Sequence, residues 1–484
     1  MSISEPQITR YHQLAETLAA AIQQGTFMPG SRLPAIRRCA ASHQVSVNTV
    51  LTAYGILEDR GLIEARPQSG YYVRDSLPSL TRQSQPRSRV NSPGSEKLDL
   101  IDAVFAAQNH TDYTNISLAC PQNTDFFPTA KLNRIMASLL RREPELIGRY
   151  ALPPGSIRLR REIARRSMDL GISISAEDVT LTHGCMEALQ LALRAVTRPG
   201  DCVGIETPTY FYLFPLIASL GLKVLEIPTD PQYGLSLDAL ELMLQEQRIQ
   251  AIIAMPNAQN PLGSSMTLEG KKRLARLVNH YQVPLLEDGL YAEIQFCWPL
   301  TPAVKAFDEH GWVLYCTSFT KTVAPDFHIG WIAAGRFSQQ LARLKSVSSL
   351  AESRLLSETL GVFLESGGYD HHLRTLRRRY AAQLDEARGI IARHFPQGTR
   401  ATRPSGGFVF WVELPGNVNS VEMFHRLLQE KICLTPGALY TLSERCNSAL
   451  RLSCCYPFNE RHIWALQRTG ALACEMSGIP AGVA

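Results

Sequence analysis

Apolar side chains in the first sixty residues recur at the spacing of helices. The pattern predicts helices over 10–24, 35–43 and 47–60. Ser46 stands directly before the third of these and can cap it, because its hydroxyl accepts a backbone N–H of the first turn. Two helices joined by a tight turn form the geometry with which many proteins read DNA.

Two short β-rich runs follow these helices. Residues 62–65 and 71–73 flank a polar, glycine-containing tip at 66–70, which predicts a pair of strands joined by a short loop. Such a hairpin after a helix-turn-helix is a wing. We therefore interpret residues 1–75 as a winged helix-turn-helix domain.

The composition then changes abruptly. Residues 76–98 are dominated by Ser, Pro, Arg and Gln, with too few apolar side chains to bury a core. We expect this stretch to be a flexible linker. The remaining residues, 99–484, are long enough for a large domain that is itself bilobal.

The large segment alternates short β-rich runs with helical stretches. The predicted strands are 179–182, 202–206, 223–227, 251–255, 284–287, 313–317 and 329–333. This alternation predicts an α/β fold with a mainly parallel seven-stranded sheet, whose ligands bind in the loops after the strands.

Charge and cysteine content limit where the protein can act and what it can bind. The formal net charge is only +5, but eleven basic residues face seven acidic ones up to Leu98, so most of the excess lies at the end that would meet DNA. The eleven cysteines are scattered without any Cys-x-x-Cys pair, which favours a reduced, cytoplasmic protein and no metal site. The sequence shows neither a secretory signal nor an apolar run of about 20 residues, so we expect no membrane association.

The N-terminal motifs carry a family resemblance. The runs Pro29-Gly-Ser-Arg-Leu-Pro34, Val45-Ser-x-x-Thr-Val50 and Gly61-Leu-Ile63 resemble the GntR-type winged helix. The resemblance implies contacts with double-stranded DNA from Arg32, Arg37, Ser46, Asn48, Thr49 and Gly70. Guanidinium and hydroxyl groups at helix starts suit phosphates and base edges. Val47 departs from the pattern, because the family often has arginine there.

The loops after the predicted strands hold candidate ligand-binding groups. Gly184-Cys185-Met186 opens a helix, whose free N–H groups and dipole favour a phosphate. Tyr210 follows the second strand, and its ring can lie against a flat cofactor. Alone, the glycine turn is weak evidence, since many helices begin in this way, and a tyrosine after a strand is more often a packing residue.

Three further polar side chains complete a more specific set. Asp288 ends a strand and can pair with a protonated pyridine nitrogen, which keeps the ring electron-poor. Asn260 and Tyr291 can both reach a phenolate oxygen on the same ring. Lys321, in the run from Ser318 to Pro325, can form a Schiff base with an aldehyde.

In this order the groups resemble the fold-type I pyridoxal-phosphate aminotransferases. The resemblance implies pyridoxal 5′-phosphate as cofactor, Lys321 as the catalytic residue, Ser318 as a cofactor contact and a smaller C-terminal α+β lobe. It also assigns Arg451, in Leu450-Arg-Leu-Ser453, to the carboxylate of a substrate or effector, which bidentate guanidinium geometry suits.

One residue departs from this second family. The pattern ordinarily places arginine at His328 to hold the cofactor phosphate. A histidine offers a weaker, pH-dependent charge, because its ordinary pKa is about 6.5. Either the remaining donors compensate, which we favour, or the chain binds its cofactor less tightly.

The combined architecture resembles the MocR subfamily of GntR-type regulators. The resemblance implies a homodimer that binds paired DNA half-sites and senses an amino acid or amine through aldimine exchange at Lys321. The alternative is a catalytically active aminotransferase with a regulatory DNA-binding head, since every group that transamination requires is present. A third hypothesis is that His328 marks a body that no longer binds pyridoxal phosphate.

Overall fold

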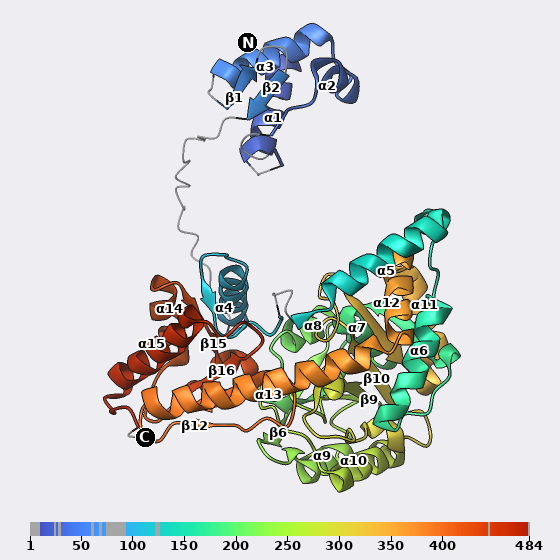
Figure 1. The fold of residues 1–484 in the computed structure, drawn as a ribbon, viewed down its shortest axis with the longest axis vertical. Coiled ribbons are helices and arrows are strands. Elements are labelled where there is room, and N and C mark those ends of the chain that lie inside the picture. Colours follow the sequence, from blue (N-terminus) through green and yellow to red (C-terminus); the bar gives the residue numbers. More distant parts are fainter. Residues whose placement is uncertain are drawn as a thin grey trace, which may run out of the picture. The chain divides into compact units, whose positions relative to one another are not determined.

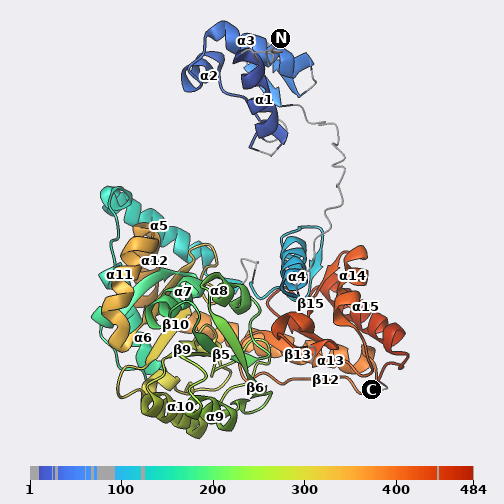
Figure 2. The same cartoon turned by 180° about the vertical axis from the view of Figure 1, so that it is seen from behind.

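The computed structural model describes most of the chain, in two compact units, Met1–Val90 and Asn91–Ala484 (Figures 1 and 2). Each unit has its own apolar core. The described residues are 10–23, 26–27, 31–59, 62–66, 70–73, 93–121, 126–443 and 446–482.

The first unit contains the predicted helices and hairpin. The helices are α1 (Arg10–Gln23), α2 (Ile36–Ser42) and α3 (Val47–Asp59), and the antiparallel strands are β1 (Ile63–Arg66) and β2 (Gly70–Val73). Leu14, Leu18, Val50, Tyr54 and Leu57 are buried together between the helices, as the apolar stripes require. The tip of the predicted wing, residues 67–69, lies outside the described residues.

Most of the expected linker, residues 76–92, also lies outside the described residues. Its last six positions, 93–98, form the start of helix α4 (Pro93–Gln108) in the second unit. Proline is well tolerated at the first position of a helix, where its missing N–H costs nothing. The Ser-Pro-Gly-Ser run at 92–95 therefore reads as a linker although a helix begins within it.

A large, mostly parallel sheet organises the second unit. Its strand order is β4-β11-β10-β9-β8-β5-β6-β7. Strand β11 is antiparallel to both its neighbours. The two-residue strand β7 is an addition to the seven predicted strands. The strands are β4 (Val179–His183), β5 (Cys202–Thr207), β6 (Lys223–Asp230), β7 (Gly234–Leu235), β8 (Ala251–Ala254), β9 (Leu285–Asp288), β10 (Val313–Ser318) and β11 (Ile329–Ala333).

Both faces of this sheet are covered by helices. In β9, Leu285 packs into one apolar cluster and Leu286 into another, because successive side chains of a strand point to opposite faces. Figure 1 shows α9 and α10 together, while α7 packs on β10 and β11. The helices are α5 (Thr129–Arg142), α6 (Ile157–Ser167), α7 (Gly184–Val196), α8 (Leu213–Ser219), α9 (Leu237–Gln245), α10 (Leu268–Tyr281), α11 (Ser338–Ser348) and α12 (Arg354–Glu365).

A smaller α+β lobe follows the long helix α13 (Gly368–His394), as the resemblance implied. Its sheet has the order β12-β13-β16-β15, and a separate parallel pair joins β14 to β3. This pairing brings the chain near Ser117 beside the C-terminal lobe. The elements are β3 (Thr114–Asn115), β12 (Arg400–Ala401), β13 (Val409–Glu413), α14 (Ser420–Gln429), β14 (Ile432–Cys433), β15 (Thr435–Pro436), β16 (Ala449–Ser453) and α15 (Glu460–Ser477).

Among the described residues, no helix combines the length and apolar character that crossing a membrane demands.

Candidate functional site

The loops at the carboxyl ends of several strands of the large sheet meet at one cavity of about 150 Å³. Parallel strands bring the loops that follow them to the same edge of a sheet, which is where ligands of open α/β folds bind. The lining residues are Ala119, Cys185, Met186, Leu189, Tyr210, Met255, Asn260, Asp288, Leu290, Tyr291, Ser318, Thr320, Lys321 and His328.

Nearly all the residues that the sequence predicts for the cofactor line this cavity, although they are spread over more than 140 positions of the chain. Gly184, the remaining one, begins α7 and lies against His328, which lines the cavity. It has a φ of +69°, and an ideal Cβ at this position would lie 2.6 Å from His328 Nε2. Only glycine therefore permits the observed approach of His328 to the end of α7.

Asp288 presents a partly buried carboxylate to the cavity. It accepts a hydrogen bond from the Leu290 N–H at 2.9 Å and from the Cys185 thiol at 3.6 Å. Burial raises the pKa of Asp288 to about 6, and no ion pair offsets this burial within the described residues. A cationic ligand nitrogen beside Asp288 would supply the missing counter-charge.

Tyr291 supplies an unused donor. Its side chain is buried against Phe408, with ring centroids 5.0 Å apart, and its hydroxyl has no hydrogen-bond partner in the structure. Burial also raises the pKa of this hydroxyl well above its ordinary value, so it remains protonated. Buried polar groups are normally paired, which makes Tyr291 a donor that awaits a ligand oxygen.

Lys321 follows the end of β10 and is partly exposed. Within the described residues, no hydrogen bond or ion pair engages its amine. Ser318 and Thr320 lie on the same turn, where the Ser318 hydroxyl donates to Thr320 Oγ1 at 3.0 Å. Sequence reasoning passed over Thr320, although its place inside the Ser318-x-x-Lys321 motif signals a second hydroxyl beside the lysine.

His328 adopts a left-handed backbone conformation, with a φ of +46°. Its pKa is lowered by burial and, to a smaller extent, by the neighbouring His183 and Lys321. The imidazole is therefore mainly neutral at pH 7. It offers a hydrogen bond to an anion rather than the permanent charge of an arginine.

A buried ion network lies under the start of α7. Glu187 accepts hydrogen bonds from Lys345 Nζ at 2.9 Å and from the His183 N–H at 2.6 Å. Burial alone would raise the pKa of Glu187, but the bonds from Ser349, His183 and Lys345 lower it overall. Lys345 is fully buried and also pairs with Glu352. The oxygens of Glu187 and Glu352 with His183 could hold a cation, yet the single Lys345 ammonium already lies between the two carboxylates and pairs with both.

Arg451, on β16, lies next to this cavity rather than in its lining. Its Nη1 is 3.5 Å from Asn260 Oδ1, and its Nη2 donates to the main-chain oxygen of Ser117. The guanidinium is 2% exposed, its Nε has no partner, and none of the ion pairs within the described residues includes it. A buried guanidinium without an acid suits an incoming carboxylate.

The predicted DNA-contacting residues are all described. Arg37, Ser46 and Asn48 are exposed, Thr49 is half-buried, and the Arg32 side chain lies against Gly70. Ser46 caps α3 as expected, since its Oγ accepts the Thr49 N–H at 3.1 Å. Val47 is 44% exposed at the start of the same helix. The expected contact surface therefore contains one apolar side chain where a positive charge was anticipated.

The cavity fits the cofactor that the aminotransferase resemblance implies. Pyridoxal phosphate carries a ring nitrogen, a phenolate oxygen and a phosphate. An uncompensated Asp288, an unpaired Tyr291 hydroxyl and the free N–H groups of α7 complement these three groups.

Comparison with known proteins bears on both units. Residues 10–73 match the bacterial regulatory proteins of the gntR family, and residues 116–460 match aminotransferase class I and II. The chain is 36% identical to the uncharacterized HTH-type transcriptional regulator YdcR of Escherichia coli, over 96% of this chain and 98% of that protein. It is 27% identical to the HTH-type transcriptional regulator NorG of Staphylococcus aureus, over 90% and 98%.

Among solved structures, the chain resembles the α-aminoadipate aminotransferase LysN of Thermus thermophilus, complexed with N-(5′-phosphopyridoxyl)-L-leucine. The TM-score is 0.72 at 25% identity, and the match covers 79% of this chain and 97% of LysN. Membership of the aminotransferase family implies pyridoxal phosphate as the cofactor. With a gntR-family domain joined to an aminotransferase class I and II domain, the chain belongs to the MocR subfamily of GntR-type regulators.

Proposed function

We propose that this chain is a DNA-binding transcription regulator that holds pyridoxal phosphate at Lys321 and responds to an amino acid. The observation that carries the proposal is a pair of charges without ion-pair partners, one lining the cavity and one beside it. Asp288 lacks a cation and Arg451 lacks a carboxylate within the described residues, so the cavity is complementary to a cationic ring and an acidic ligand together.

Each side chain has a role in holding the cofactor. Asp288 pairs with the ring nitrogen, Asn260 and Tyr291 donate to the phenolate oxygen, and the Tyr210 ring lies against the cofactor ring. The N–H groups at Gly184, Cys185 and Met186 bind the phosphate together with Ser318 and His328, and we add Thr320 to this set. When bound, the cofactor supplies an aldehyde that reacts reversibly with primary amines.

Lys321 and Arg451 then select the effector. The Lys321 amine holds the cofactor until the amine of the effector replaces it, and Arg451 binds the effector's carboxylate. The burial of Arg451 favours an amino acid over a simple amine, because an occupant without a carboxylate leaves the guanidinium uncompensated.

An effector can act on DNA binding only if it stabilises one conformation of the protein more than another. We propose that the second unit forms a homodimer, so that two winged helices reach paired half-sites. Exposed apolar side chains support this. Tyr150 and Leu152 are 77% and 58% exposed on either side of Ala151, whose backbone forms a β-bridge with Glu352. Val347, a few residues before Glu352 in the sequence, is 78% exposed. A protein that binds promoters acts in the cytoplasm of a bacterium, which is the location we propose.

A working aminotransferase is the second candidate. Asp288 would keep the ring cationic and Lys321 would carry the proton between the two carbon atoms, so the groups for turnover are present. A panel of amino acids added to the purified full chain separates the two candidates. Release of a keto acid over many turnovers favours the enzyme, whereas an absorbance change without product and with altered DNA affinity favours the regulator.

The cofactor assignment has its own test. Lys321→Ala should lose the visible absorbance of the lysine-bound cofactor, while the exposed control Lys223→Ala keeps it. A coloured Lys321→Ala protein whose chromophore borohydride fixes to the chain would refute the assignment.

A further inference from the structure

A second cavity, of about 580 Å³, lies outside the site described above. It is bounded by α6, by the segment 296–298 that follows β9, and by the first turns of α13. None of its lining residues lines the cofactor cavity. They are Arg165, Arg166, Asp169, Phe296, Cys297, Trp298, Asp370, Leu373, Arg374, Arg377 and Arg378.

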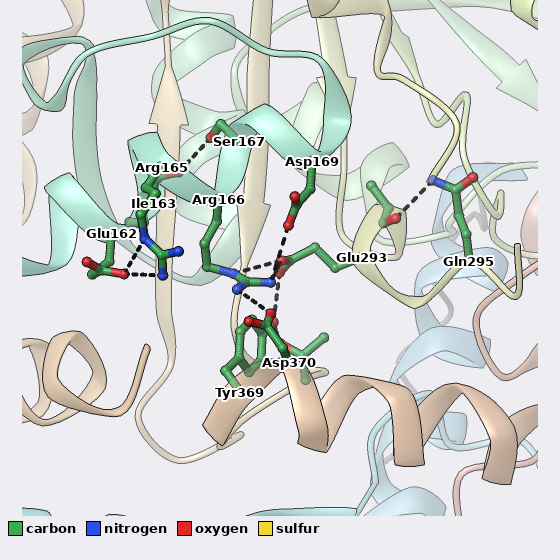
Figure 3. A network of polar contacts seen from close by, with 12 residues as sticks. Glu162, Ile163, Arg165, Arg166, Ser167, Asp169, Glu293, Gln295, Tyr369 and Asp370 are labelled. Carbon is green, nitrogen blue, oxygen red and sulfur yellow. Dashed lines mark hydrogen bonds and ion pairs between the residues drawn. The ribbon is translucent and has the colours of Figure 1, made fainter. Parts of the chain in front are cut away.

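Two of the five arginines are occupied by carboxylates. Arg166 is buried and pairs with Glu293 at 3.0 Å and with Asp370 at 2.7 Å, as Figure 3 shows. Its guanidinium also lies 4.3 Å from the centre of the Tyr369 ring. Arg165 pairs with Glu162 at 2.6 Å. Arg166 therefore joins α6 to α13 and to the segment after β9, whereas the Arg165 pair lies within α6.

The other three arginines that line this cavity come from α13, and none of them forms an ion pair within the described residues. Arg374 and Arg378 are exposed and one helical turn apart, and no hydrogen bond or ion pair involves either one within the described part of the chain. Arg377 donates from Nε and Nη2 to the main-chain oxygen of Glu293, at 2.9 and 2.6 Å, and this oxygen is uncharged. Like charges at this spacing repel each other, and a bridging anion would relieve the repulsion.

An exposed aromatic ring faces the same space. Trp298 is 68% exposed, and the Arg377 guanidinium lies 5.4 Å from its ring centre. Phe296 and Leu373 extend the apolar wall beside it. An exposed indole in a cavity lined by guanidinium groups offers a flat stacking surface beside an anion-binding surface.

We propose that this cavity binds a small anion that carries a flat ring, with the acidic group on Arg374 and Arg378 and the ring against Trp298. The acidic group is a phosphate or a carboxylate. This binding site goes beyond the proposed function, since it uses neither Lys321 nor Arg451 and requires no amine on the ligand.

The test uses the full chain with its cofactor bound, so that a phosphate compound cannot enter the cofactor's own phosphate site. Phenyl phosphate, benzoate and inorganic phosphate are titrated by calorimetry, with the cofactor absorbance recorded throughout. We expect saturable binding of a ring-bearing acid, at least tenfold tighter than inorganic phosphate, and the tighter of the two ring acids identifies the acidic group.

Three variants assign the binding to this cavity. Arg374→Gln with Arg378→Gln should weaken binding at least tenfold, and Trp298→Ala should remove the advantage of the ring over inorganic phosphate. Arg393→Gln, an exposed arginine in the last turn of the same helix, is the matched control and should change nothing. All variants should keep the cofactor absorbance, which separates this proposal from the cofactor assignment. Absence of saturable binding, binding that survives the double substitution, or a titration that alters the cofactor absorbance would overturn the proposal.

Discussion

His328 stands against Gly184 so closely that its Nε2 would lie 2.6 Å from a Cβ at that position. The contact places an imidazole at the start of α7, where the family usually has an arginine and where the helix N–H groups favour an anion. If the cofactor phosphate binds here as proposed, it would rely more on backbone donors than on fixed positive charge.

Replacing this imidazole by a permanent charge should strengthen cofactor binding. We expect His328→Arg to bind pyridoxal phosphate roughly tenfold more tightly, because a charge-assisted hydrogen bond contributes about 1.5 to 3 kcal/mol. The pKa of His328 is lowered, so the wild-type imidazole gains charge only as the pH falls below its ordinary value of about 6.5. Equilibrium dialysis at pH 6 and pH 8 measures the affinities. The ratio of variant to wild-type affinity should be larger at pH 8, and an unchanged affinity at both pH values would mean that His328 does not face the phosphate.

The Asp288 carboxylate, which we propose binds the cofactor, should lower the free energy of unfolding of the cofactor-free protein. Its pKa is raised to about 6 from 3.8, so the native state binds the extra proton and the wild-type protein loses stability as the pH rises through this window. Well above pH 6, the loss in the free energy of unfolding is on the order of 3 kcal/mol. Asp288→Asn should therefore raise the free energy of unfolding of the apoprotein, with a gain that grows from pH 4 to pH 7.

Urea denaturation of both apoproteins across that pH range measures this gain. The same variant should bind the cofactor more weakly, because the ring nitrogen loses its anionic partner. An Asp288→Asn protein that is less stable at pH 7 and binds the cofactor normally would show that the carboxylate has another role.

The buried Lys345 should be a major stabilising residue. Lys345→Met leaves Glu187 and Glu352 without their cation, and removal of one partner of a buried ion pair costs about 3 to 5 kcal/mol. Because the lost partner is a cation, the deficit should shrink at low pH, where the carboxylates left without it take up protons. Denaturation at pH 5 and pH 8 tests this, with Lys223→Met as the exposed control. Equal stability of Lys345→Met and wild type at pH 8 would contradict the network.

The affinity of the winged helix for DNA should fall with salt concentration, to a degree set by its arginines. Arg37→Ala should weaken binding to all DNA sequences and reduce the slope of log affinity against log salt by about 0.9, the value for one phosphate contact. Val47→Arg should make the slope steeper, since Val47 is exposed at the start of α3. Fluorescence anisotropy with operator and scrambled DNA measures both slopes. Arg134→Ala, an exposed arginine of the other unit, should leave them unchanged; a similar loss in this control would remove the assignment of Arg37.

A feature of the fold or of the site could be predicted from the sequence when the residues that form it lie close together along the chain. The strands, the glycine turn before α7 and Asp288 at the end of β9 follow from local patterns, because period and turn chemistry act over a few residues. The two-residue strands of the small lobe are too short to show an alternation of apolar and polar residues. The pairing of Lys345 with Glu187 joins residues 158 positions apart, and the sequence shows only ordinary charged side chains there.

The same distinction holds for the ligand sites. Arg451 was assigned through resemblance alone, and its contact with Ser117 spans 334 positions. The sequence did not predict the arginine-rich cavity. Its arginines in α13 look like ordinary solvated charges, and only the folded chain brings Trp298 beside them. Local sequence chemistry predicts which residue types are available, whereas long-range packing decides which charges remain unpaired.

In the proposed function, an amino acid acts at Lys321 and changes DNA binding. The most direct measurement titrates amino acids into the full chain and follows the cofactor absorbance together with affinity for the DNA upstream of its own gene. At least one amino acid should shift the absorbance and change the DNA affinity about 5- to 150-fold, the range of typical coupling energies, and Lys321→Ala should abolish both effects. Sustained release of keto acid with unchanged DNA affinity, or an effect on DNA binding that persists in Lys321→Ala, would contradict the account.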